Sequence, residues 1–99
     1  MLQNIKYALL QMNAINRIFV YMPTVFEANG YRFFFYSNEN NEPIHIHVSK
    51  GSAEAKYWIS SDPEEVYSYG FKVKERKEIK ILVKDNAGKI IEKWNEFFK

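Results

Sequence analysis

The chain has 99 residues, 46% hydrophobic and 17% aromatic, which is enough for one small domain with a modest core. It contains no cysteine, and this excludes disulfides, thiolate nucleophiles and cysteine-ligated zinc. The net charge is only +2, but residues 72–99 hold nine Lys and Arg against five Asp and Glu, so the basic charge gathers in the C-terminal part.

The first 21 residues place apolar side chains at steps of three and four, which is the period of an amphipathic helix. These side chains are Leu2, Ile5, Leu9, Met12, Ile15 and Phe19. We therefore expect a helix over 2–17 and treat residues 1–21 as an extension, able to mediate oligomerisation, in front of a single domain over 22–99. No apolar run approaches the roughly 20 residues of a membrane span, and no secretory signal is recognisable. We expect a cytoplasmic protein that makes no membrane contact.

From Pro23 onward the apolar period changes to two, which is typical of strands. The pattern predicts strands over 24–27, 31–37, 44–49 and 53–60. Asn29-Gly30 is a strong signal for a two-residue hairpin between the first two strands. Residues 38–43 are polar and end in Pro43, which indicates a loop.

Two helices close the chain. Ile79 and Val83 share one helical face, and Ile90 and Trp94 continue it. Residues 85–88 combine capping residues with a glycine, so we expect helices over 73–85 and 88–98. The predicted fold is α+β, a four-stranded antiparallel sheet with two C-terminal helices on one face and an additional N-terminal amphipathic helix.

A basic stripe lies on the first of these helices, on the side away from its apolar face. It consists of Lys77, Lys80 and Lys84. Such a stripe is a candidate binding surface for RNA or for an acidic protein, and solvated surface lysines are its ordinary interpretation.

Both histidines of the chain lie two residues apart, in the strand predicted over 44–49. If Lys50-Gly51 forms the next turn, Ile44, Ile46 and Val48 share the apolar face. His45 and His47 then lie on the other face with Glu54, Lys56 and Trp58. In this register Glu54 lies across from His47, and Lys56 lies across from His45.

Several short segments follow one another through the chain in a characteristic order. They are Met22-Pro23-Thr24, Gly30 with the aromatic strand after it, His45-Ile46-His47-Val48, Glu54-Ala55-Lys56-Tyr57-Trp58-Ile59, Gly70-Phe71 and Trp94-Asn95-Glu96-Phe97-Phe98. From Met22 to Phe98 this order resembles the bacterial domain-of-unknown-function family 4160 (DUF4160). The resemblance implies a small cytoplasmic protein, often encoded beside another small open reading frame as in toxin–antitoxin modules, and therefore a cognate small protein partner. It implies no settled activity and no cofactor.

Three interpretations of the histidine face remain open. The first is a metal site of His45, His47 and Glu54, although a zinc site normally needs three ligands with supporting hydrogen bonds. The second is metal-independent RNA cleavage, with His47 and Glu54 as an oriented acid–base pair, Lys56 stabilising negative charge and His45 as a further catalytic candidate.

The third interpretation of the histidine face is a protein-binding surface that includes Trp58, and we rank it first. The alternative without a binding function is a pair of amphipathic strand histidines that are hydrogen-bonded to their neighbours. The function that we expect is thus a protein-interaction component of a two-gene, toxin–antitoxin-like module.

Overall fold

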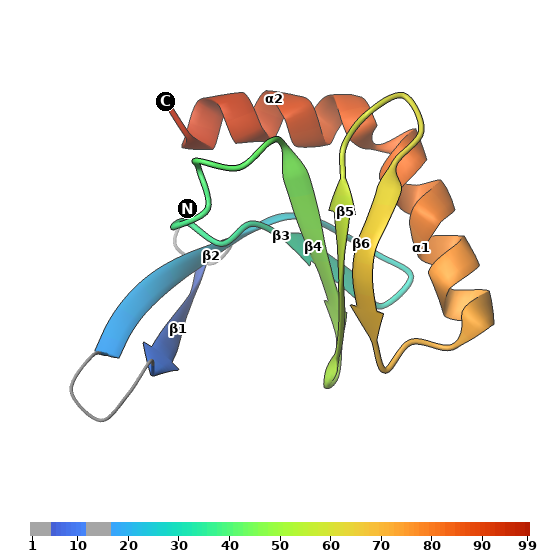
Figure 1. Cartoon of the computed structure of the whole chain (residues 1–99), viewed down its shortest axis with the longest axis horizontal. Coiled ribbons are helices and arrows are strands. Elements are labelled where there is room, and N and C mark those ends of the chain that lie inside the picture. The colour runs from blue at the N-terminus through green and yellow to red at the C-terminus, as the bar shows by residue number, and fades with distance from the viewer. Residues whose placement is uncertain (1–4, 12–16) are drawn as a thin grey trace.

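The computed structural model describes residues 5–11 and 17–99. Its elements are β1 (Ile5–Gln11), β2 (Arg17–Ala28), β3 (Tyr31–Phe34), β4 (His45–Lys50), β5 (Ala53–Trp58), β6 (Glu64–Tyr69), α1 (Val73–Asp85) and α2 (Ala87–Phe97). Strands β2–β6 form an antiparallel sheet in chain order, and β1 extends it beyond β2 (Figure 1). The α+β class and the two C-terminal helices are confirmed. Among the described residues, no helix is long and apolar enough to cross a membrane.

The hairpin between β2 and β3 has the turn that the sequence predicts. Asn29 and Gly30 both have positive φ, 53° and 84°, and Ala28 pairs with Tyr31 across them. Two consecutive positive φ angles define the type I′ turn, whose twist matches that of the strands. Strand β2 is much longer than the predicted strand over 24–27, because it begins at Arg17.

The helix predicted over 2–17 is wrong where the structure describes this segment. Ile5–Gln11 is a strand, and it pairs antiparallel with β2 from Ile5 opposite Pro23 to Gln11 opposite Arg17. The rest of the predicted helix, residues 2–4 and 12–16, lies outside the described residues. Ile, Val, Tyr and Phe are frequent in 5–11 and 17–21, and these residue types favour strands. The helical spacing was thus a weaker signal than residue type. In Figure 1 the β1–β2 arm projects away from both helices.

The expectation of only four strands also missed β6. Its sequence, Glu64–Tyr69, has no alternation of apolar and polar residues, and its residues are partly or fully exposed. Strand β6 is the last strand of the sheet and pairs with β5 along one side only. An edge strand does not need the alternation that marks a buried strand, so binary patterning gives no signal here.

The core lies between one sheet face and the two helices. The sheet contributes Ile46, Val48, Ala55 and Tyr57, and the helices contribute Ile79, Val83, Ile90 and Trp94. All of these side chains are buried, so both helices cover the same sheet face. This was the face predicted to be apolar, and the prediction is confirmed.

The β4–β5 register differs from the prediction by two residues. His47 pairs with Lys56 and His45 with Trp58, because the turn residues are Gly51 and Ser52. Gly51 has φ 58°, which suits the first central position of a type II′ turn. A shift of two leaves every side chain on its face but changes its partner. Burial patterning therefore could not distinguish the two registers.

Replacement of two glycines by alanine should have opposite effects on stability. Gly70 has φ 80°, and a Cβ there would lie 3.1 Å from Cβ and 3.2 Å from Cα of Ala53, whereas a Cβ on Gly88 in α2 would meet nothing within 4 Å. Gly70→Ala should therefore lower the free energy of unfolding by about 1–3 kcal/mol, since it combines backbone strain with a close contact. Gly88→Ala should raise it by about 0.5 kcal/mol through helix propensity. Urea denaturation of both variants measures these shifts, and equal signs would contradict the assignment.

Candidate functional site

The sheet face opposite the helices carries the polar residues of three neighbouring strands. His47 of β4 pairs with Lys56 of β5, which in turn pairs with Tyr67 of β6. Glu54 lies on the same face, two residues before Lys56 in β5, because side chains two residues apart on a strand point to the same side of the sheet. Both helices lie on the other side of the sheet. We refer to this surface as the helix-free face.

The loop between β3 and β4 folds back over one end of this face. The backbone N–H of Glu39 donates to the Tyr36 carbonyl oxygen at 3.2 Å, and the N–H of Glu42 donates to that of Glu39 at 3.2 Å. These successive turns bring the carboxylates of Glu39 and Glu42 over the start of β4. Figure 1 shows this loop passing from β3 to β4 beneath α2.

A single carboxylate oxygen of Glu39 lies between the two imidazoles. Its Oε1 is 2.8 Å from Nε2 of His45 and 2.7 Å from Nε2 of His47. His45 is 0% exposed and His47 is 1% exposed, whereas the Glu39 side chain is 23% exposed. The loop therefore supplies the common partner of two histidines that solvent does not reach.

The other ring nitrogen of each histidine also faces oxygen. Nδ1 of His45 lies 2.9 Å from the Pro43 carbonyl oxygen. Nδ1 of His47 lies 3.2 Å from the Tyr67 hydroxyl and 3.4 Å from Oε2 of Glu54. Since a carbonyl oxygen only accepts hydrogen bonds, Nδ1 of His45 carries a proton. Both rings are thus held in fixed orientations.

Charge and burial oppose one another in this cluster. Burial would raise the pKa of Glu39, but its hydrogen bonds to His45 and His47 hold that pKa far below its usual range. Burial likewise favours neutral His47, but hydrogen bonds to Glu39 and Glu54 raise its pKa overall. The pKa of Glu54 is lowered in the same way, because hydrogen bonds from His47 and Tyr67 outweigh burial.

Lys56 belongs to a second contact between the loop and the sheet. Its Nζ donates to Oε1 of Glu42 at 2.6 Å and lies 4.6 Å from the centre of the Trp58 ring. Oε1 of Glu42 is also 3.9 Å from Nδ1 of His45. The ammonium group is therefore committed to the loop and is turned away from open solvent.

The structure brings together only part of the predicted site. His47 and Glu54 are close, but diagonally and not directly across the strands, and Lys56 lies opposite His47 and not His45. The third group on the imidazoles is Glu39 and not Glu54, and ring contacts with Trp58 and Trp94 enclose His45. Glu39, Glu42, Tyr36 and Tyr67 were not predicted. The signal was present, since two glutamates directly precede a strand whose buried histidines need acceptors.

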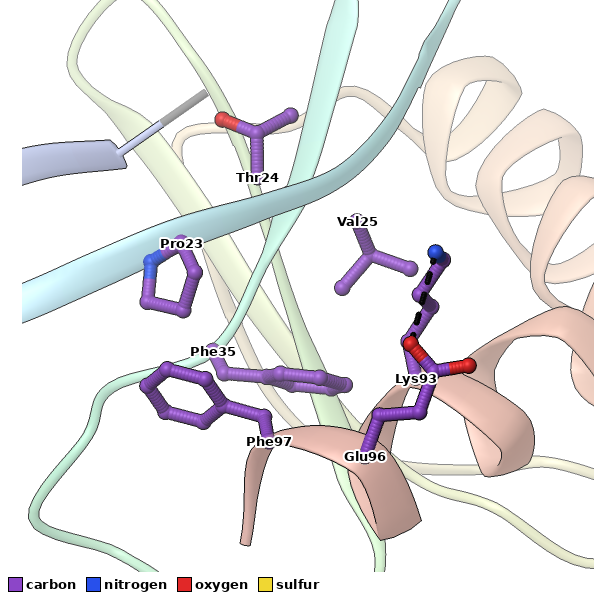
Figure 2. A pocket seen from close by; sticks show the side chains of 7 residues that line it. All are labelled: Pro23, Thr24, Val25, Phe35, Lys93, Glu96 and Phe97. Atoms are coloured by element: carbon purple, nitrogen blue, oxygen red, sulfur yellow. Dashed lines mark ion pairs between the residues drawn. The ribbon is translucent and has the colours of Figure 1, made fainter. Parts of the chain in front are cut away.

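Two concavities lie elsewhere on the molecule. Figure 2 shows the first, of about 250 Å³, where Pro23, Val25 and Phe35 face Phe97 and an ion pair of Lys93 with Glu96 (3.7 Å). The second, of about 310 Å³, is lined by residues of the sheet and α1, namely Tyr57, Glu65, Val73, Arg76, Lys77 and Lys80.

The predicted basic stripe of Lys77, Lys80 and Lys84 is thus on α1, on the helix-covered side of the sheet. Lys80 lies 3.7 Å from Asp62. The stripe is not brought together with the histidines.

Glu54 holds two tyrosines in place, and one of them can be tested with a matched pair of variants. The Tyr67 hydroxyl donates to Oε2 of Glu54 at 3.0 Å, whereas Tyr69, two residues further on, is 68% exposed. Tyr67→Phe should lower the free energy of unfolding by about 1–2 kcal/mol, because it removes a bond to a charged group. Tyr69→Phe should change it by less than about 0.5 kcal/mol. Equal losses in urea denaturation would show that the hydroxyl of Tyr67 has no special role.

Comparison with known proteins gives one match. No curated protein and no solved structure matches the chain. The model of the family described as "Domain of unknown function (DUF4160)" matches residues 30–95, which include every residue of the site from Tyr36 to Tyr67. Because this match covers well over half of the 99 residues, the chain belongs to the DUF4160 family.

Proposed function

We propose that this chain is a small bacterial cytoplasmic protein that binds a protein partner encoded beside it, as one component of a toxin–antitoxin-like pair. The observation that carries the proposal is the tyrosine cluster on the helix-free face. It consists of Tyr36, Tyr67 and Tyr69. Tyr36 and Tyr67 are half-buried and Tyr69 is exposed.

The tyrosine cluster has the composition and the rigidity of a binding surface. Tyr36 and Tyr67 donate to the two oxygens of Glu54 at 3.1 and 3.0 Å, and the rings of Tyr67 and Tyr69 are 5.2 Å apart. Tyrosine is enriched among the residues that dominate binding energy at protein interfaces. Side chains that are already ordered lose little entropy when a partner binds, so the bonds to Glu54 favour affinity.

The position of the cluster also favours a polypeptide partner. Tyr67 and Tyr69 belong to β6, which is the last strand of the sheet. An edge strand presents backbone N–H and C=O groups with which an extended segment can pair, while its side chains contact the partner. The binding surface that we propose is therefore the tyrosine cluster together with the β6 edge.

This proposal replaces direct contact through the histidines. His45 and His47 are buried beneath the loop, so a partner on the helix-free face would contact the tyrosines beside them. The same burial argues against RNA cleavage by His47, Glu54 and Lys56. An RNA substrate would first have to displace Glu39 and Glu42 from the face.

Co-purification with the neighbouring gene product tests the proposal directly. The chain and its neighbour should form a complex whose dissociation constant rises at least about tenfold in Tyr69→Ser, the equivalent of about 1.4 kcal/mol. Ile81→Ser is the matched control, since Ile81 is a large apolar residue of similar exposure (61%) on α1. It should leave affinity unchanged. Absence of a complex, or an equal loss in both variants, would refute the proposed surface.

A further inference from the structure

The cluster beneath the loop has a property that protein binding does not explain. Nε2 of His45, Nε2 of His47 and Oε1 of Glu39 lie within 4.8 Å of one another. If the His45 ring is neutral and its one proton is on Nδ1, where it is donated to Pro43, the Nε2 lone pair points at a carboxylate oxygen. The same holds for His47 when its Nδ1–H is directed at Glu54. Three electron-pair donors then converge on one point.

Converging lone pairs repel unless a positive charge lies between them. The carboxylates within ion-pair distance of these imidazoles are Glu39, Glu42 and Glu54, and the one ammonium group beside them is that of Lys56. With both imidazoles neutral, these described groups carry a net charge of −2. A dication at the point of convergence would balance this charge, beside two imidazoles that are themselves buried.

We propose that Glu39, His45 and His47 bind one divalent transition-metal ion of the Zn²⁺ type. Two imidazole nitrogens and one carboxylate oxygen form a ligand set that zinc and its neighbours prefer, whereas Mg²⁺ and Ca²⁺ favour oxygen alone. Three protein ligands leave a fourth position for water or another ligand. The metal ligands are not members of the tyrosine cluster, and the metal site needs no protein partner, so the proposal does not depend on the proposed function.

The surroundings of the two imidazoles support metal ligation. Histidine ligands of metals almost always donate their second N–H to a carbonyl or carboxylate oxygen, which fixes the ring. The Pro43 carbonyl stands in this position for His45, and Glu54 with Tyr67 for His47. The metal site expected from the sequence had Glu54 as a ligand. The structure instead places Glu54 behind His47 and Glu39 in front of it.

The Glu39 carboxylate lies closer to the imidazoles than two ligands of one zinc ion lie to each other. Donors around a tetrahedral zinc ion, with bonds of about 2.0–2.1 Å, lie about 3.3 Å apart. Oε1 of Glu39 is 2.7–2.8 Å from each Nε2, so both of these distances must lengthen by about 0.5 Å when a metal ion binds. Glu39 is on a loop and partly exposed, so its carboxylate can withdraw from the histidines.

Titration of the tag-free, chelator-treated full chain with ZnCl₂ tests the proposal. One equivalent should bind, CoCl₂ should give the visible absorption of a four-coordinate nitrogen–oxygen site, and Zn²⁺ should raise the melting temperature. Glu39→Gln should weaken Zn²⁺ binding at least about tenfold. Glu92→Gln is the matched control, because it removes one exposed carboxylate on α2, on the other side of the sheet, and its Zn²⁺ affinity should stay within about threefold of the wild type.

The results show whether a metal ion or protons carry the positive charge between Glu39 and the imidazoles. Loss of binding in Glu39→Gln alone, with circular dichroism showing both variants folded, supports the site. If Glu39→Gln fails to fold, Glu39→Asp, which keeps the charge but shortens the reach, should show the same loss. Absence of stoichiometric Zn²⁺ binding, or equal affinity in the Glu39 and Glu92 variants, overturns the proposal. The positive charge between Glu39 and the imidazoles would then be carried by protons.

Discussion

The contact of one loop carboxylate with two buried imidazoles is the interaction on which the helix-free face depends. Two histidines without solvent contact are tolerated only if their ring nitrogens find partners, because an unsatisfied buried polar group costs several kcal/mol. Glu39 satisfies both Nε2 atoms at once, and Pro43, Glu54 and Tyr67 face the Nδ1 atoms. The Lys56–Glu42 pair fixes the same loop at a second point. The loop is therefore part of the sheet's packing and not a free connection.

The two sheet faces divide the physical tasks of this small domain. Ile46, Val48, Ala55 and Tyr57 supply an apolar layer that the helices complete, so cohesion on this side comes mainly from apolar burial. The opposite face is ordered by hydrogen bonds and ion pairs, which are directional and cost free energy when incomplete. Such a network contributes less to stability than to fixing the positions of its members. This is the property that a binding surface or a ligand site requires.

The sequence was sufficient for features set by local pattern and insufficient for features set by distant pairing. Period two placed His45, His47 and Lys56 on one face, and helical period placed Ile79 and Val83 in the core. The Asn29-Gly30 turn followed from the positive φ that both positions require. The β4–β5 register did not follow, because a two-residue shift leaves the burial pattern unchanged, although Gly51 at the first turn position would have indicated it. Glu39 escaped prediction because a polar loop carries no period, and its position depends on turns at Tyr36 and Glu39 that the residue types do not specify. The strand at 5–11 was mistaken for a helix because its apolar residues also fit helical steps of three and four, although their types favour a strand.

Glu54 connects the two sites proposed for the helix-free face. One of its oxygens accepts from Tyr36, and the other accepts from Tyr67 and faces Nδ1 of His47. A dication on Nε2 of His47 would make the Nδ1–H more acidic and strengthen its bond to Glu54, so the carboxylate would be held more firmly beneath the tyrosines. A partner bound to the tyrosine cluster would, in turn, restrict the same carboxylate. Because linkage between two sites is reciprocal, a metal that raises partner affinity must itself bind more tightly to the complex. The short path through Glu54 thus gives a physical connection between the buried histidine pair and the tyrosine cluster.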